Sequence, residues 1–421
     1  MVITSERTPT SVLPAGIAAA IVGLLGEDLP VRIDCYDGSG AGPKDATTRI
    51  VVRTPDALRY ILTAPGELGF ARAYVAGALD LEGDVFEALE LRDRLPDVRL
   101  HAPQWLAFAR LLGTAGFRRP PIPAEEARLH GRRHSKARDA AAISYHYDVS
   151  NDFYRMILGP SMTYSCAVFT SADASLEDAQ AAKYDLVCRK LGLRPGMRLL
   201  DVGCGWGGMV MHAARHYGIR AVGVTLSRKQ AVHATRAATD AGLDGVEIRV
   251  QDYRDVGGHF DAISSIGMFE HVGLARLGEY FSHLLQLLPP GGRLLNHGIS
   301  RPPGHRSRFN HRGFIDRYVF PDGELHEVGT VVSRMQQSGF EVRHVESLRE
   351  HYALTLRHWV KNLEGNWADA IAAAGAARAR VWRLYMAGSA INFEANRNQI
   401  HQVLAIRTDA GRSGTPLRPD W

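Results

Sequence analysis

The segment MRLLDVGCGWGG, residues 197–208, constrains the fold of this 421-residue chain more than any other. Its apolar half is typical of a buried strand that ends at Asp201, and its glycine-rich half is typical of a tight turn into a helix. Helix-like and strand-like segments then alternate: MVMHAARHYG, IRAVGVTLS, RKQAVHATRAATDAG, VEIRVQDY and FDAISSIGMFEHVG. This alternation predicts an α/β fold with a parallel sheet, helices on both faces and a ligand at the carboxyl ends of the strands.

The glycine-rich turn limits which ligand the sheet can bind. Its GxGxG spacing differs from the GxGxxG of dinucleotide-binding folds, and it lacks the GK[ST] ending of a phosphate loop. A turn without a ligand is one interpretation. The other is a resemblance to the first motif of Rossmann-like S-adenosylmethionine-dependent methyltransferases, which implies that Gly203, Cys204 and Gly205 line the methionine part of the cofactor. Asp252 and Tyr253, at the end of the third strand, then suit the adenine amino group and ring face.

The chain before this region has a different character. Residues 1–117 contain a strand that runs into a helix near Pro55 and short apolar runs separated by glycines, which predicts a smaller α+β domain with a role in binding or assembly. Residues 118–138 contain seven Arg or Lys residues and three prolines. Such a segment is typical of a solvated linker, and it could also contact nucleic acid or an anionic membrane face.

Cysteine usage and apolar runs indicate the compartment. The four cysteines are widely spaced with no CxxC pair, so neither a zinc site nor a disulfide framework is indicated, and a reducing cytoplasm fits. The apolar run at residues 14–25 is too short to span a bilayer and lacks a basic region and a cleavage site. We interpret it as an amphipathic or core helix, with contact to a membrane surface as the alternative.

Several segments together resemble the cyclopropane fatty acid synthases and the related mycolic acid methyltransferases. They follow the family's order over about residues 140 to 400: YHYDVSNDFY, TYSCAVF, DVGCGWGG, GVTLSRKQ, SIGMFEHVG, NHGIS, RYVFPDG and HYALTLRHW. The amino-terminal part, residues 1–117, resembles the extra domain of bacterial phospholipid-acting synthases, which implies a role in lipid binding or dimerisation. The resemblance makes residues 139–421 the methyltransferase domain, with a lipid-covering insertion after about His297. The resemblance implies transfer of a one-carbon unit from S-adenosylmethionine to the cis double bond of an unsaturated phospholipid acyl chain.

The resemblance also implies which residues contact the cofactor. The second strand ends in VGVTLSRKQ, without the acidic residue that usually binds the ribose hydroxyls. Thr225 and Gln230 would replace this acid. The remaining implied cofactor contacts are Tyr164, Ser165, Leu226 and Ser227.

A second set matches the positions that hold a bicarbonate ion in this family: Cys166, Glu270, His297, Ile299 and Tyr318. On the resemblance, Cys166 contributes main-chain groups to the wall of the anion site and does not attack as a thiol. Taken singly, His297 could be a core or turn histidine, Glu270 an acid favoured at a helix N-terminus, and Tyr318 a packing residue. Their joint occurrence in the family's order favours the functional interpretation.

The expected chemistry leaves two products open. Attack of the alkene on a sulfonium leaves a carbocation, which the aromatic faces of Tyr318, Phe269 or Tyr147 could stabilise, and bicarbonate would remove a proton. Proton loss from the added methyl group closes a cyclopropane ring. A hydride shift and proton loss elsewhere gives a 10-methylene chain, which a flavin- or NADPH-dependent reductase partner would reduce. Ser389, where many family members carry cysteine, and the arginine- and alanine-rich composition keep the second product open.

Membrane phospholipids are the expected partners, and the inner face of the plasma membrane is the expected location of a cytoplasmic, peripheral enzyme. Contact would be made by the basic residues Arg118, Arg119, Arg132, Arg133, Lys136 and Arg138. A nucleic acid methyltransferase usually needs aromatic stacking for a flipped base and a dedicated polar motif; neither is evident, so nucleic acid is not expected. A non-catalytic scaffold for a partner reductase is disfavoured by the five anion-site positions.

Overall fold

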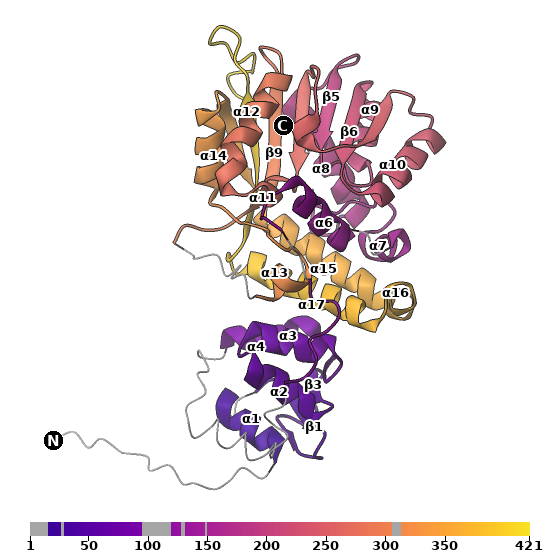
Figure 1. The fold of residues 1–421 in the computed structure, drawn as a ribbon, viewed down its shortest axis with the longest axis vertical. Helices are drawn as coiled ribbons and strands as arrows, with labels where there is room; N and C mark the ends of the chain where they lie inside the picture. Colours follow the sequence, from indigo (N-terminus) through magenta and orange to yellow (C-terminus); the bar gives the residue numbers. More distant parts are fainter. Residues whose placement is uncertain (1–15, 27–28, 95–118, 128–130, 148–149, 305–312) are drawn as a thin grey trace, which may run out of the picture. The chain divides into compact units, whose positions relative to one another are not determined.

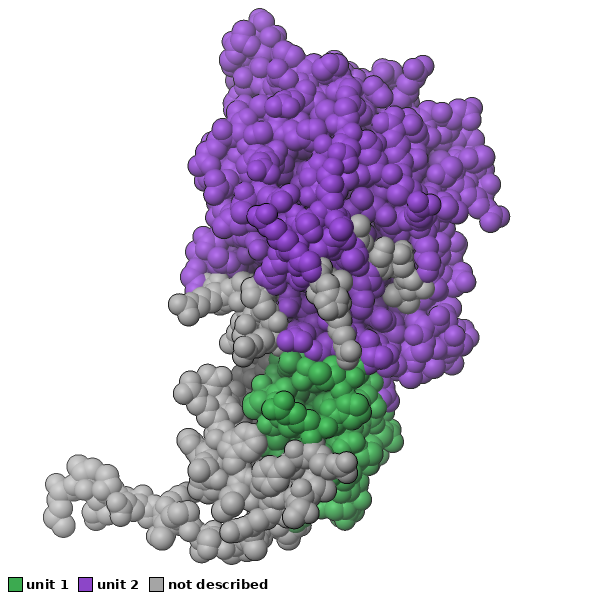
Figure 2. All heavy atoms as spheres, in the orientation of Figure 1, with its two compact units in different colours: residues 1–123 green, residues 124–421 purple. Residues whose placement is uncertain are grey.

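The computed structural model describes residues 16–26, 29–94, 119–127, 131–147, 150–304 and 313–421. The chain divides into two compact units, residues 1–123 and 124–421 (Figure 2). The boundary between the units therefore falls inside the segment predicted as a linker, and residues 124–138 belong to the larger unit.

The smaller unit combines a short sheet with helices. Its elements are α1 (Ile17–Leu25), β1 (Arg32–Cys35), β2 (Gly40–Ala41), β3 (Arg49–Val52), α2 (Pro55–Thr63), α3 (Glu67–Val75), β4 (Leu79–Glu82) and α4 (Val85–Arg94). The strand order is β2-β1-β3-β4, with β1 and β3 parallel. Pro55 begins α2 directly after β3, because its fixed φ suits the first helical position. Helix α1 buries Ile17, Ala18 and Ala20, so this part of the apolar run is a core helix.

The larger unit is built on a sheet that, within the described residues, has the strand order β10-β11-β9-β8-β5-β6-β7 (Figure 1). The strands are β5 (Arg198–Val202), β6 (Arg220–Thr225), β7 (Val246–Val250), β8 (Ala262–Ile266), β9 (Arg293–Ser300), β10 (Glu341–Ser347) and β11 (Gln399–Ile406). Strands β5 to β9 pair in parallel, whereas β11 is antiparallel to both β9 and β10. The predicted α/β class is confirmed, and the antiparallel edge is an addition that the alternating pattern does not predict.

Helices cover both faces of this sheet (Figure 1). The helices of the larger unit in the described residues are α6 (Lys136–Tyr147), α7 (Asn151–Leu158), α8 (Leu176–Leu191), α9 (Gly208–Tyr217), α10 (Arg228–Asp240), η2 (Tyr253–Asp255), α11 (Phe269–Val272), η3 (Leu274–Arg276), α12 (Leu277–Leu287), α13 (Phe314–Tyr318), α14 (Val328–Gln337), α15 (Arg349–Gly365), α16 (Trp367–Ala374) and α17 (Ala376–Glu394). Helices α15 to α17 connect β10 to β11, and α7 packs against α15 and α16. This helical insertion follows β10, so it comes later in the chain than the insertion predicted after His297.

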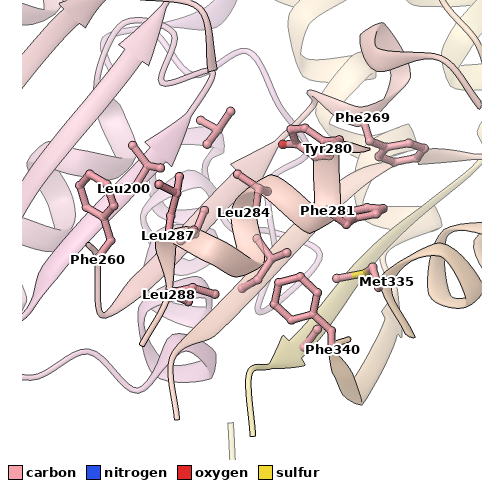
Figure 3. Packing of buried hydrophobic residues seen from close by; sticks show 14 of the residues in the cluster. Leu200, Phe260, Phe269, Tyr280, Phe281, Leu284, Leu287, Leu288, Met335 and Phe340 are labelled. Atoms are coloured by element: carbon pink, nitrogen blue, oxygen red, sulfur yellow. The ribbon is translucent and has the colours of Figure 1, made fainter. Parts of the chain in front are cut away.

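Strand residues divide between two apolar clusters according to the face they point to. Leu200 and Leu294 pack with Phe281, Leu284 and other residues of α12 and α14 (Figure 3). Their neighbours Leu199 and Leu295 pack instead with residues of α8 and α9. Because successive strand residues alternate between faces, this assignment also fixes the face of the polar residues further along each strand.

Candidate active site

The glycine-rich turn lies where the order of the sheet reverses. Strands β6 and β7 follow β5 on one side, and β8 and β9 lie on the other, which is where open α/β sheets bind ligands. Gly203 and Gly205 have φ of 78° and 55°, in the left-handed region. A Cβ on Gly203 would lie 2.6 Å from the Met268 sulfur, whereas a Cβ on Gly205 would meet no described atom within 4 Å beyond its chain neighbours. The turn therefore leaves room for a ligand to approach its backbone.

The side chain of Cys204 packs against the sheet. A Cβ on Gly223 of β6 would lie 2.9 Å from its sulfur, and burial raises the pKa of the Cys204 thiol. The Cys204 N–H donates to the Val224 carbonyl at 3.0 Å and its carbonyl accepts the Gly207 N–H at 2.9 Å, so the main-chain group left for a cofactor is the second lone pair of that carbonyl oxygen. Before the turn, Asp201 is buried and accepts a hydrogen bond of 2.6 Å from the Ser264 hydroxyl. Burial raises the pKa of Asp201 to about 6, although Ser264 and a nearby lysine lower it.

The residues predicted to replace the ribose acid form one network after β6. The Thr225 hydroxyl accepts the Ser227 N–H at 3.2 Å and donates to the Gln230 amide oxygen at 2.8 Å. Ser227 caps α10, and its hydroxyl accepts the Gln230 N–H. With its amide oxygen bonded to Thr225, Gln230 can offer N–H donors to the oxygens of a ribose. Leu226 is half-buried between these residues.

Asp252, predicted to bind the adenine amino group, lies at the end of β7 and caps η2. Its carboxylate accepts hydrogen bonds of 2.8 and 2.6 Å from the Arg254 guanidinium, which also bonds to Asp139 of α6 at 3.0 Å. Burial alone would raise the pKa of Asp252, but the Arg254 hydrogen bonds lower it overall. Tyr253 packs edge to face on Tyr280. Asp252 is thus ionised, and a carboxylate retains acceptor sites beyond those that Arg254 occupies.

Residues 164–166 are held from the side of α8. The Lys183 ammonium donates to the Ser165 hydroxyl at 3.0 Å, and the Gln180 amide donates to the Ser165 carbonyl at 2.9 Å. Burial lowers the pKa of Lys183 to about 7, while Asp201 raises it. Cys166 is fully buried, and burial raises the pKa of its thiol, which donates to the Ala167 carbonyl at 3.2 Å. A buried, protonated thiol is a poor nucleophile.

Glu270 lies in α11, just after the carboxyl end of β8, and His297 lies within β9, opposite Ile266 at the end of β8; both are buried. The Ile299 N–H donates to Glu270 Oε1 at 2.6 Å, while Glu270 Oε2 and His297 Nε2 have no hydrogen-bond partner within the described part of the chain. Burial raises the pKa of Glu270 to about 7, against a smaller lowering by the Ile299 N–H. Burial also lowers the pKa of His297, so its imidazole is neutral. Two buried polar atoms that lack partners fit a small polar ligand.

Tyr318 makes a different contact. Its hydroxyl donates to Glu126 Oε2 at 3.2 Å, and Arg317 donates to the other oxygen of this buried carboxylate at 2.8 Å. Tyr318 ends the short helix α13 and thereby connects it to the segment that precedes α6. The fit to a small anion therefore rests on Glu270 and His297.

An aromatic cluster lies around Tyr164, and sequence reasoning missed it. The Tyr164 hydroxyl donates to the Tyr385 hydroxyl at 3.0 Å. The Tyr164 ring also lies within ring-contact distance of four other rings: His146 of α6, Tyr154 of α7, Trp359 of α15 and Trp382 of α17. These rings come from distant parts of the chain, so no spacing rule could have found them. Two other rings were predicted to stabilise the carbocation. Phe269 is buried beside Gly298, and the side chain of Tyr147 lies outside the described residues.

Three of the basic residues predicted to face a membrane form ion pairs within the larger unit. Arg133 and Arg138 both pair with Asp322, and Lys136 pairs with Asp255 at 2.7 Å. Arg119 and Arg132 are exposed, and Arg118 lies outside the described residues. The three paired residues, predicted to contact a membrane, therefore hold residues 131–138 against the rest of the larger unit. In the described ranges, no helix combines the length and apolar character needed to cross a bilayer.

Comparison with known proteins decides the family. The profile of the family described as mycolic acid cyclopropane synthetase matches residues 134–403. The chain belongs to this family. It is 50% identical over 406 residues to a Mycobacterium tuberculosis H37Rv protein named a probable fatty acid methyltransferase, covering 93% of this chain and 95% of that protein. It is also 34% identical over 370 residues to the Escherichia coli K12 cyclopropane-fatty-acyl-phospholipid synthase, covering 88% and 89%.

A solved structure supports the same relationship over 63% of the chain. The mycolic acid cyclopropane synthase CmaA1, crystallised with SAH and CTAB, aligns with a TM-score of 0.61 and 36% identity, over 63% of this chain and 98% of that chain. The predicted family and enzyme class are confirmed: the chain is an S-adenosylmethionine-dependent methyltransferase of the cyclopropane synthase family, which modifies lipid acyl chains.

Proposed function

We propose that this enzyme transfers a one-carbon unit from S-adenosylmethionine to the cis double bond of an unsaturated phospholipid acyl chain, and that a bicarbonate ion held by Glu270 and His297 accepts the proton that is lost. The observation that carries the proposal is the pair of buried atoms, Glu270 Oε2 and His297 Nε2, that lack protein partners within the described residues. When bound, S-adenosylmethionine supplies the methyl group and bicarbonate supplies a base.

The chain's own residues hold the reactants and protect the intermediate. The main chain at residues 203–205 and the Thr225–Gln230 network bind the cofactor. The aromatic cluster around Tyr164 offers ring faces to a carbocation on the acyl chain and excludes water that would trap it. The thiol of Cys166 is protonated and fully buried, so it does not react with the carbocation.

A phospholipid substrate is favoured by the coverage of the relatives. The match to the E. coli phospholipid synthase includes 88% of this chain, so it extends into the smaller unit. The match to CmaA1 includes only 63% of this chain, and the family profile matches residues 134–403, which lie in the larger unit. We therefore assign lipid presentation or dimerisation to the smaller unit, and we place the enzyme on the inner face of the plasma membrane.

A second product is favoured by the names of two relatives. The M. tuberculosis protein at 50% identity and a Pseudomonas putida protein at 42% identity are both named probable fatty acid methyltransferases. On this alternative, a hydride shift precedes proton loss, and the 10-methylene chain passes to a flavin- or NADPH-dependent reductase partner. Loss of the proton from the added methyl group instead gives the cyclopropane.

The test is expression in a bacterial host that lacks such an enzyme and is supplied with oleate. Mass spectrometry should show phospholipid acyl chains that have gained one carbon, and proton NMR should show upfield ring protons for the cyclopropane or vinylidene protons for the methylene product. Acyl chains without added carbon, in cells that contain the folded protein, would refute the proposal. The His297→Ala variant should bind cofactor and lose turnover.

A further inference from the structure

A row of polar side chains crosses the sheet beside His297. The strand register places Glu346 of β10 opposite Gln402 of β11, and Gln402 opposite His297 of β9. Residues directly opposite each other in an antiparallel pair point to the same face, so the three side chains lie in one row. His297 shares the face of Leu295, which packs with residues of α8.

Lys190 of α8 lies on this row. Its side chain is fully buried, and its ammonium donates to the Glu346 carboxylate and, at 2.7 Å, to the Gln402 amide oxygen. Burial lowers the pKa of Lys190 below its ordinary value, although the hydrogen bond and charge of Glu346 oppose this shift. The direct contact with the Glu346 carboxylate favours the protonated amine, and an ammonium offers donors without an acceptor.

The ammonium fixes the orientation of the Gln402 amide. The amide oxygen must face Lys190, because the reversed amide would bring two donors together at 2.7 Å. The amide nitrogen consequently faces His297 Nδ1, at 3.4 Å. Since that nitrogen is a donor, Nδ1 must accept and carries no proton. A neutral imidazole then carries its single proton on Nε2.

We propose that Lys190 and Gln402 are positioning residues that hold His297 in the Nε2-protonated tautomer, so that His297 donates a hydrogen bond to a small oxyanion and does not act as a base. The inference rests on the proposed function for the identity of that anion, but the tautomer follows from the hydrogen bonds alone. His297 Nε2 is the ring atom that has no protein partner in the described residues.

The charges around His297 favour the same assignment. Lys183, Lys190 and His401 are the groups whose charge acts on the imidazole, and each disfavours a second proton on it. Lys183 and Lys190 are seven residues apart on α8, so both face the sheet about two turns apart. Protonated Glu270 would add an Oε2–H donor, because its Oε1 accepts the Ile299 N–H.

The experiment measures the tautomer directly by ¹H–¹⁵N NMR of the full-length chain labelled in histidine, in carbonate-free buffer. The His297 signal is assigned by its loss in His297→Asn. We expect the proton on Nε2. In Gln402→Glu the new carboxylate accepts from Nδ1–H, so the proton should move to Nδ1 or both nitrogens should be protonated. In Lys190→Met the amide is free to reverse, so both tautomers should appear.

Binding of ¹³C-bicarbonate provides the second readout. Gln402→Glu should weaken it by roughly tenfold to a hundredfold, the range seen when the partner that orients a metal-ligating histidine is changed. Gln399→Glu, the same change on the same strand, and Lys361→Met, at an exposed position of α15, are the matched controls and should leave both readouts unchanged.

The outcomes separate the two ideas. A proton on Nδ1 in the wild-type chain overturns the positioning role, whether or not bicarbonate binds, and this result does not depend on any variant folding. A proton on Nε2 that moves in Gln402→Glu, in a chain that binds no bicarbonate, supports the positioning role and refutes the proposed anion. A tautomer that is unchanged in a folded Gln402→Glu chain also overturns the inference.

Discussion

Replacing Glu270 by glutamine should stabilise the fold at alkaline pH while it lowers turnover. Burial raises the pKa of Glu270 from 4.5 to about 7 in the native chain, whereas the unfolded chain keeps the ordinary value. The native state thus holds the proton more tightly, so the wild-type protein loses stability as the pH rises from about 4.5 to about 7. Glutamine has no such proton and can still accept the Ile299 N–H through its Oε1.

The magnitude follows from the pKa difference. At pH 5 the native carboxyl is neutral, like the amide, whereas at pH 8 it is a buried carboxylate. With 1.36 kcal/mol for each pKa unit, the free energy of unfolding of the variant should gain about 2.5 kcal/mol on that of the wild type between pH 5 and pH 8. Turnover should fall because an amide can donate from the same position but, unlike the Glu270 carboxyl, cannot give up or take up a proton.

The assay is urea unfolding followed by tryptophan fluorescence, in carbonate-free buffers at several pH values. Three buried tryptophans report on the larger unit: Trp206, Trp359 and Trp382. Glu279→Gln, at an exposed position of α12, controls for the loss of a carboxyl group and should show no such pH trend. A difference between wild type and Glu270→Gln that stays constant with pH, or that falls toward pH 8, would refute the reasoning.

Three further substitutions test other contacts. Gly203→Ala should weaken binding of S-adenosylhomocysteine, measured by calorimetry, at least about tenfold. The new Cβ would lie 2.6 Å from the Met268 sulfur, and residue 203 has a φ of 78° that only glycine adopts readily. An unchanged affinity would contradict this close packing of the turn. Cys166→Ala should retain turnover, and an inactive but folded variant would restore a role for the thiol. Tyr318→Phe should lower the free energy of unfolding by about 1.5–3 kcal/mol, because the buried Glu126 carboxylate loses a hydrogen-bond donor. The bicarbonate dependence of turnover should stay unchanged in this variant. A changed dependence would mean that Tyr318 belongs to the anion site.

The sheet was predictable because its signal is local. Each buried strand is a short apolar run and each crossover helix follows its own turn, so DVGCGWGG and the following alternation define the parallel part without long-range information. The cofactor network after β6 was also accessible, since Thr225, Ser227 and Gln230 are close in sequence and bond to one another. Both the parallel strands and this hydrogen-bond network depend on residues that are close together in the sequence.

The polar environment of the site was not predictable in this way. Gln402 stands in the apolar strand QIHQVLAI, and Lys190 stands near the end of α8; each taken alone is typical of an exposed residue. Only the register of β11 against β9 and β10 brings them to His297. The same limitation applies to Tyr318, whose partner Glu126 lies 192 residues away. Likewise Arg133 and Arg138 pair with Asp322, and a count of basic residues in one segment does not reveal an acidic partner so far along the chain.

The antiparallel strand β11 connects the two halves of the proposed chemistry. It enters the sheet between β9 and β10 and places Gln402 opposite His297. The connection from β10 to β11 is also the segment that carries α15 and α17, whose Trp359, Trp382 and Tyr385 line the aromatic cluster at Tyr164. The Leu348 N–H, just before α15, donates to the Ile400 carbonyl of β11 at 3.0 Å, so the start of this insertion is fixed to the strand that carries Gln402. On the proposed mechanism, a displacement of β11 would therefore disturb both the ring faces offered to the cation and the tautomer of His297, so that cation stabilisation and proton removal would both depend on this one strand.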